Sequence, residues 1–387
     1  MFSARLPPRL DSNALARALE RARSSGRTLI DLTISNPTQV GFSYPPELFR
    51  ALSSPDVARY LPTPFGLPET RRAVAGEYQR RGLSIPWEHI VLTASTSEAY
   101  SLLFKLLCAP CGDSVLTPVP SYPLFEHLTA LDGVAARPYR LDYDARWSLD
   151  LSSVDVTWDS RTKAVLAVTP NNPSGSMLSG SEYAALDGRC AERGAALIVD
   201  EVFADYMLDP ASSPEVPAVG QALTFRLGGL SKSAALPQVK LGWFAVEGSH
   251  PLLGEALERL ELICDTYLSV STPVQVAAPA MLALGGHVRT QVLERIRRNY
   301  AELTRMSAAY ASVDLLAAQG GWTAVLRVPT RGPEEQLVLQ LLEQDGVLVY
   351  PGFFFDFPRE SYVIVSLLPE PDRFAAGIQR VLERADA

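Results

Sequence analysis

The chain of 387 residues contains few lysines and no excess of positive charge. Arginine carries nearly all of the basic character, because only four lysines are present: Lys105, Lys163, Lys232 and Lys240. Acidic residues outnumber basic ones, and the formal net charge is −8. Binding to the phosphate backbone of a nucleic acid requires a basic face. The composition therefore argues against a nucleic acid as a partner.

Metal ligands and cysteines are also scarce. The histidines are scattered along the chain without the spacing of a metal site, at His89, His127, His250 and His287. Cys108 and Cys111 form a C-x-x-C pair, but no second pair or nearby histidine completes a zinc site. The pair could be redox-active, or it could consist of two incidental thiols in a reducing cytosol, which is the simpler interpretation. We expect no metal in this protein.

Long apolar runs are absent, and so is a Gly-Lys pair. No run reaches the roughly 18 apolar residues of a membrane span, and residues 1–12 lack a signal-peptide core. These absences predict a cytoplasmic protein. A P-loop nucleotidase requires a Gly-Lys pair, so that class is excluded. Apolar content of 47% and charged content of 20% are typical of a globular enzyme, and the length predicts about two or three domains.

The middle of the chain alternates apolar strands with helical segments. This order predicts a mostly parallel sheet with helices on both faces. Asn172, Asp200 and Lys232 each follow or end such a strand. Ligands of such sheets bind at the carboxyl ends of the strands, so we expect these three side chains around one cleft. From Gly320 short strands and helices mix, which predicts a smaller α+β domain of residues 1–44 and 286–387 beside a large domain of residues 45–285.

Lys232 stands in GLSKS, between two apolar runs. Burial of an ammonium group is costly, and it lowers the lysine pKa and makes the amine a nucleophile. The alternative is a solvated lysine in a turn between two strands.

Other polar residues allow two interpretations each. Ser95, Thr96 and Ser97 stand at a predicted helix start, where free N–H groups and the helix dipole could bind an anion, or where they could simply cap the helix. Tyr122 could face a cleft or pack against its neighbours. Asn36 could form a turn with Pro37 or face the cleft, and the turn is the simpler interpretation.

The order of these motifs resembles that of the class I/II aminotransferases, which are pyridoxal-phosphate enzymes of fold type I. The resemblance runs from about Leu32 to the C-terminus. Its landmarks are SNPT at 35–38, Y-x-P-x-P-x-G-L-P-E at 60–69, TASTSEA at 93–99, PSYP at 120–123, NNPSG at 171–175, IVDE at 198–201 and GLSKS at 229–233.

The resemblance implies pyridoxal 5'-phosphate as the cofactor, with Lys232 as its Schiff-base lysine and as the carrier of the substrate's α-proton. Asp200 would pair with the pyridinium nitrogen of the cofactor. Asn172 would hydrogen-bond its phenolic oxygen, and Tyr122 would stack on its ring.

The same resemblance implies a phosphate site and a homodimer. Ser95, Thr96 and Ser97 would cradle the cofactor's phosphate, with Ser231 and Lys240 also in contact with the cofactor. Tyr60 would reach the phosphate from the neighbouring subunit, so the two subunits would share their active sites.

The sequence departs from the family pattern in four places. The family usually has arginine at Lys240, serine at Gly229 and tyrosine at Phe203. The arginine that binds the substrate's carboxylate is replaced by Ile364. Because arginine is the side chain whose fork matches a carboxylate, we expect Arg359 to take this role, with Asn172, Asn36 or Arg327 as alternatives.

The resemblance implies transfer of an amino group between an L-amino acid and a 2-oxo acid. A second possibility keeps the cofactor but eliminates a group at a C–S or similar bond of the substrate. A third is a non-catalytic cofactor-binding module, such as the sensor half of a transcription regulator. The roughly 30 residues before the first landmark argue against this third possibility.

Overall fold

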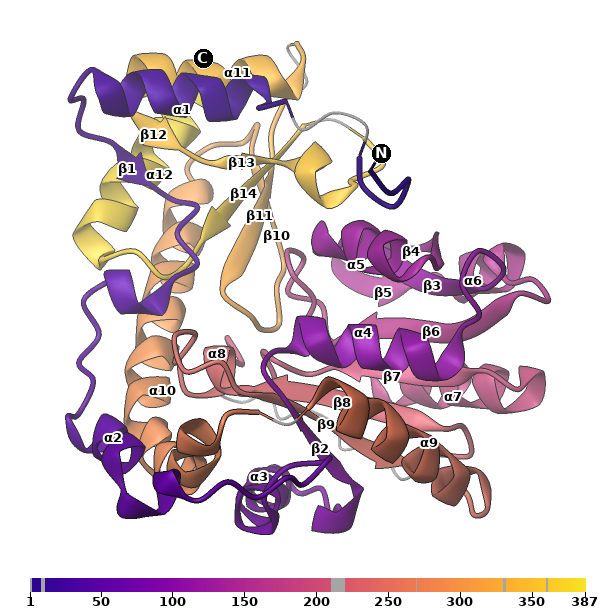
Figure 1. The fold of residues 1–387 in the computed structure, drawn as a ribbon. Coiled ribbons are helices and arrows are strands. Elements are labelled where there is room, and N and C mark those ends of the chain that lie inside the picture. The colour runs from indigo at the N-terminus through magenta and orange to yellow at the C-terminus, as the bar shows by residue number, and fades with distance from the viewer. Residues whose placement is uncertain (1, 8–10, 210–219, 269, 330–331, 360) are drawn as a thin grey trace.

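A computed structural model describes residues 2–7, 11–209, 220–268, 270–329, 332–359 and 361–387. Its centre is an eight-stranded sheet of order β2-β9-β8-β7-β6-β3-β4-β5 (Figure 1). The strands are β2 (Ile90–Thr93), β3 (Ser114–Val119), β4 (Ala135–Asp144), β5 (Arg146–Leu149), β6 (Thr162–Val168), β7 (Ala196–Asp200), β8 (Thr224–Gly229) and β9 (Gly242–Glu247). The five strands from β8 to β4 run parallel, and β9 and β5 pair antiparallel with their neighbours.

Helices cover both faces of this sheet, as the sequence predicted. The inner strands read as continuous apolar runs because both of their faces are buried, and every residue of β7 is buried. On one face pack α4 (Thr96–Leu107), α5 (Leu124–Asp132) and α9 (Leu252–Tyr267). On the other face pack α6 (Leu151–Thr157) and α7 (Gly180–Arg193). The expected α/β class of the large part is therefore confirmed.

A smaller antiparallel sheet follows toward the C-terminus, in the order β10-β11-β14-β13. Its strands are β10 (Asp314–Leu316), β11 (Thr323–Arg327), β13 (Tyr350–Pro351) and β14 (Tyr362–Ser366). The N-terminal part of the chain lies with this sheet, because β1 (Ile30–Asp31) pairs in parallel with β12 (Val347–Leu348). Around these strands lie α1 (Ala14–Ser24), α11 (Glu334–Gln340) and α12 (Pro371–Asp386), as Figure 1 shows.

One long helix, α10 (Thr272–Ser307), runs beside both parts of the molecule (Figure 1). It has 36 residues and continues through Pro279. The boundary that we expected between residues 285 and 286 falls inside this helix, which therefore belongs to both parts.

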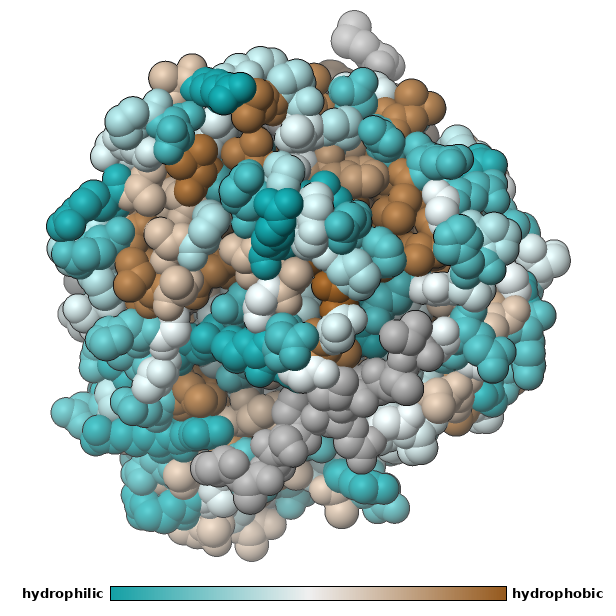
Figure 2. All heavy atoms as spheres, turned by 90° about the horizontal axis from the view of Figure 1, so that it is seen from below, coloured by the Kyte–Doolittle hydropathy of each residue, from teal (hydrophilic) through white to brown (hydrophobic). Residues whose placement is uncertain are grey.

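The remaining helices are short or lie beside the large sheet. They are α2 (Glu47–Arg50), α3 (Pro68–Arg80) and α8 (Leu230–Ser233). Seen from below, the molecule presents hydrophilic side chains interspersed with apolar ones (Figure 2). In the part of the chain that the structure describes, no helix is long and apolar enough to cross a membrane.

Candidate active site

A cavity of about 540 Å³ lies at the carboxyl ends of β6, β7 and β8, where the sequence placed the cleft. Both parts of the molecule line it. The predicted site residues among its walls are Ser95, Thr96, Ser97, Tyr122, Asn172, Asp200, Ser231 and Lys232. The small sheet and the segment before α2 contribute further walls. Apart from Ile364, the sequence analysis assigned no role to these residues. They are Thr33, Ser35, Trp322, Thr323, Tyr350, Phe354, Phe355, Ile364 and Ser366.

Lys232 lies in α8, directly after β8, with its amine among aromatic rings. Its Nζ atom is 4.8 Å from the centre of the Trp322 ring and 5.5 Å from that of Phe203. Burial lowers the pKa of Lys232 to about 8, against the opposing charge of Asp200. The Tyr206 hydroxyl donates to the Lys232 carbonyl oxygen over 2.6 Å and so fixes the backbone of α8. The amine is still mostly protonated at pH 7, but its neutral, nucleophilic fraction is far larger than that of an ordinary lysine.

Asp200 is the last residue of β7 and is 6% exposed. The Tyr100 hydroxyl donates to Oδ2 over 2.7 Å, and the Val202 N–H donates to Oδ1 over 3.1 Å. Burial raises the pKa of Asp200 to about 6, and these hydrogen bonds oppose the rise. The carboxylate is thus mostly ionised at pH 7, and it can hold a positively charged N–H group in the cavity.

The N-terminus of α4 opens into the same cavity, and Ser95, the residue before the helix, caps it. The Ser95 hydroxyl accepts from the Glu98 N–H over 3.1 Å, while the Glu98 carboxylate accepts from the Ala94 N–H over 2.5 Å. Thr96 and Ser97 line the cavity at the first turn, where helix N–H groups attract anions. A side chain at Gly242 would come within 3.0 Å of the Thr96 nitrogen, so glycine permits this close approach of β9.

Asn172 and Tyr122 lie on two loops that both line the cavity. The Thr323 hydroxyl approaches the Asn172 side-chain oxygen at 3.5 Å. Tyr122 is 42% exposed and meets Phe125 edge to face, with ring centres 6.2 Å apart. The neighbouring Asn171 is buried and donates to the Ser121 hydroxyl over 3.2 Å, which ties the two loops together.

Four predicted site residues do not line this cavity. Asn36 caps a short 3-10 helix (Pro37–Gln39), and its side-chain oxygen accepts from the Thr38 N–H over 3.1 Å, as the turn interpretation supposed. Tyr60 is 67% exposed, and Lys240 and Arg359 are also exposed.

Arg359 comes shortly after Phe354 and Phe355, which line the cavity, but it is itself exposed and does not line the cavity that holds Lys232. Arg327, the alternative, pairs with Asp314 over 2.6 Å in an exposed position. Among the described residues that line the cavity, Lys232 is the only cation. The assignment of the substrate's carboxylate to Arg359 stays a prediction.

Tyr100 and Trp322 are site residues that the sequence analysis missed. Tyr100 lies one helical turn after Thr96, a spacing that places both on one face of α4 and that could have found it. Trp322 directly precedes β11 in the other part of the molecule. No local pattern in the sequence indicates that it lies beside Lys232.

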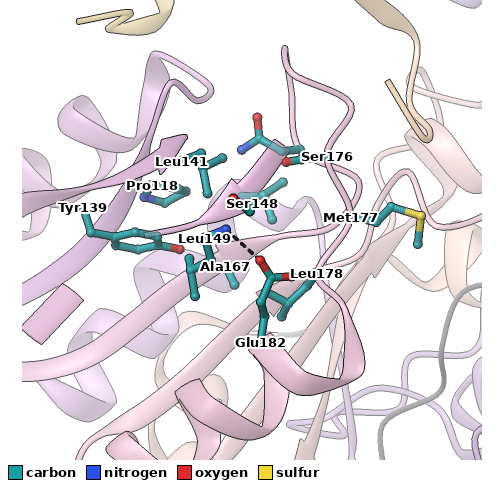
Figure 3. A pocket seen from close by; sticks show the side chains of 12 residues that line it. Pro118, Tyr139, Leu141, Ser148, Leu149, Ala167, Ser176, Met177, Leu178 and Glu182 are labelled. Carbon is teal, nitrogen blue, oxygen red and sulfur yellow. Dashed lines mark hydrogen bonds between the residues drawn. The ribbon is translucent and has the colours of Figure 1, made fainter. Parts of the chain in front are cut away.

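A smaller pocket of about 20 Å³ lies between β4, β5 and the start of α7 (Figure 3). Its one carboxylate, Glu182, accepts from the Leu149 N–H over 2.7 Å and from the Ser179 hydroxyl over 2.6 Å. Both carboxylate oxygens are therefore occupied in capping α7 and joining β5 to it. We interpret this pocket as structural. Within the described ranges, no three His, Cys, Asp or Glu residues are grouped as metal ligands.

The cavity joins a nucleophilic lysine, a buried carboxylate and a helix N-terminus at the end of a parallel sheet, which defines an enzyme site for an anionic, amine-reactive group. The family comparison makes the class specific. The model of the aminotransferases of class I and II matches residues 11–371, and the chain belongs to this family. It is an aminotransferase, which exchanges an amino group between an amino acid and a 2-oxo acid.

Named relatives agree with this assignment. The chain is 25% identical to the glutamate-pyruvate aminotransferase AlaA of Haemophilus influenzae, over 93% of this chain and 91% of that one. It is 26% identical to the alanine aminotransferase of Mycobacterium tuberculosis, over 93% and 86% of the two chains. An aminotransferase structure from Escherichia coli superposes with a TM-score of 0.87 at 22% identity, over 99% of this chain and 97% of that one, which shows the common fold.

Proposed function

We propose that the cavity binds pyridoxal phosphate and that Lys232 is the residue to which the cofactor's aldehyde is attached. The observation that carries this proposal is the meeting of three groups in one cavity: an amine whose pKa is about 8, the buried Asp200 carboxylate, and the N-terminus of α4. These groups match an aldehyde, a ring nitrogen and a phosphate, so the donor set fits the cofactor.

The chain's own residues divide the work as follows. When bound, the cofactor supplies an electron sink for the electron pair left on the substrate's α-carbon. Asp200, ionised at neutral pH, holds the ring nitrogen in its protonated form. Lys232 Nζ would take the proton from the substrate's α-carbon. Tyr122 and Asn172 hold the ring in place.

The phosphate rests on Thr96, Ser97 and the first N–H groups of α4 in this proposal. Lys240 is exposed and is not among the residues that line the cavity, and its contact with the cofactor stays a prediction. Tyr60 would complete the phosphate site from the partner subunit of a homodimer. Its 67% exposure leaves it available for such a contact.

The substrates follow from the class of reaction and from the relatives' names. Alanine, glutamate and pyruvate are the first compounds to test, because relatives of this chain are named for them. We place the enzyme in the cytoplasm, which agrees with the four free cysteines. Elimination at a C–S bond is the less favoured alternative. It would release pyruvate and ammonia from cysteine-type substrates without any added oxo acid.

Borohydride trapping tests the proposal directly. The holoenzyme is reduced and digested, and the pyridoxyl group should be found on the peptide that carries Lys232. The matched control is Lys240→Met, which removes an exposed lysine eight residues away and should leave the label unchanged. A label on Lys105, Lys163 or Lys240 would overturn the assignment.

A further inference from the structure

A second hollow of about 380 Å³ adjoins the active cavity beneath α1. Thr33, Ser35, Tyr350 and Phe354 line both hollows, so these residues form the boundary that the two spaces share. Beyond these residues the groove is lined by the apolar Leu15, Leu19, Ile34 and Leu348 and also by the polar Asn13, Asn36 and Gln39. A groove under the N-terminal helix therefore lies next to the active cavity.

The wall between the cavity and this groove is aromatic and aliphatic. The centre of the Tyr350 ring lies 6.0 Å from the centre of the Phe354 ring and 5.9 Å from that of the Phe355 ring. Ile364 is 1% exposed and pairs in the sheet with Tyr350. Such a surface stabilises an apolar side chain by roughly 25 cal/mol per Å² of area removed from water.

The charges around the cavity disfavour a substrate whose side chain is acidic. Among described residues lining the cavity Lys232 is the only cation, and the reaction itself uses it. The groove has one arginine, Arg23, which is exposed on α1. The one carboxylate of the groove, Asp31, accepts from the Thr33 hydroxyl over 2.6 Å and from its N–H over 2.7 Å. A second carboxylate, carried by the substrate's side chain and buried against the aromatic wall, would lack a partner from this subunit, which is costly.

We propose that the preferred amino donor carries a large apolar side chain, which packs against Tyr350, Phe354 and Ile364 and points toward the groove under α1. Tyr350 and Phe354 are the specificity-determining residues, because they form the junction of the two hollows. This inference rests on the proposed function and names the substrate class of the same site.

The test compares donors on the holoenzyme with one common oxo acid. We expect kcat/KM for L-phenylalanine and L-leucine to exceed that for L-alanine and L-glutamate by about tenfold or more, the size of discrimination that apolar pockets achieve. Phe354→Ala should lower kcat/KM for L-phenylalanine by about tenfold and that for L-alanine less than threefold.

Phe353→Ala is the matched control. Phe353 is the adjacent phenylalanine, is 43% exposed and lines neither hollow. Its ring lies 5.0 Å from that of Phe354, so this variant removes packing behind Phe354 without removing a wall of the site, and the ratio of the two donors should stay unchanged. If Phe354→Ala does not fold, Phe354→Leu keeps most of the packing and should still lower the ratio. Binding of 3-phenylpropionate, followed through the cofactor's absorbance, supplies a readout that does not depend on turnover.

Several results would overturn the inference. A preference for L-glutamate that disappears in Arg23→Ala would show that the groove selects an acidic side chain. An equal loss for all donors in Phe354→Ala would reduce Phe354 to a structural role. Failure of the proposed function is distinct: it would appear as no turnover with any donor together with no label on Lys232, and this inference would then fail with it.

Discussion

Replacement of Lys232 by methionine should stabilise the protein when no cofactor is bound. Methionine has a similar length, and it removes the ammonium group that lies among Trp322 and Phe203. The pKa of Lys232 is about 8, against 10.5 for an ordinary lysine. At about 1.4 kcal/mol per pH unit, this difference corresponds to a cost of about 3 kcal/mol for the protonated amine. The side chain is partly accessible through the cavity, so we expect a gain of about 2 kcal/mol.

The sign of the pH dependence follows from the lowered pKa. Below pH 8 both the folded and the unfolded chain bind the proton, so the cost is fully present. Between pH 8 and 10.5 the folded chain releases the proton while the unfolded chain keeps it, and the stability of the wild type rises. The advantage of Lys232→Met should therefore be largest below pH 8 and should shrink toward pH 10.5.

Urea denaturation of both apo proteins, followed by tryptophan fluorescence, measures the difference. Other groups titrate in this range, but they occur in both chains and cancel in the comparison. The matched control is Lys240→Met, whose exposed amine should give a pH-independent change within about 0.5 kcal/mol. A Lys232→Met protein that is less stable than the wild type at pH 7, or a gap that does not change with pH, would refute the reasoning.

Three further predictions concern other residues of the structure. Phe203→Tyr should place a hydroxyl at the cavity wall and lower the pH at which the loaded enzyme changes colour, and an unchanged spectrophotometric titration would show that another donor fills this role. If Arg359 binds the substrate's carboxylate, Arg359→Ala should lower kcat/KM for every donor, by an amount that corresponds to about 2–4 kcal/mol of lost transition-state stabilisation. Near-normal turnover would remove Arg359 from the site. Arg226→Ala should cost about 3–5 kcal/mol in the free energy of unfolding, because the 1%-exposed Arg226 pairs with the carboxylates of Glu201, at 2.7 Å, and Glu247. Although burial of the carboxyl opposes this, Arg81 and Arg226 hold the pKa of Glu201 below its ordinary value. The loss should therefore shrink as acid protonates Glu201, and a loss that is the same at pH 4 and pH 7 would contradict this account.

The class of the fold could be read from the sequence because its signals are local. Continuous apolar runs identify strands buried on both faces, and the helical segments between them require a parallel sheet with helices on each side. The confirmed α/β architecture follows from these patterns. The same rule brought Asn172, Asp200 and Lys232 to one cavity, because the carboxyl ends of parallel strands share an edge.

The extent of single elements was harder to predict. The helix α10 continues for 36 residues through Pro279 and across the expected domain boundary. A proline inside a helical pattern usually indicates an end or a kink. Here, contacts of α10 with both parts of the molecule outweigh that local preference.

The sequence by itself determined which residues we propose for the chemistry, since Lys232, Asp200 and the hydroxyls at the start of α4 are placed by the strands and the helix that they adjoin. Only the tertiary structure decided what surrounds them. Trp322 reaches Lys232 from 90 positions along the chain, and Tyr350 meets the N-terminal segment because β1 pairs with β12. Local patterns fix the ends of strands, but the walls of a cavity depend on which distant segments pack together, and no local pattern encodes that choice.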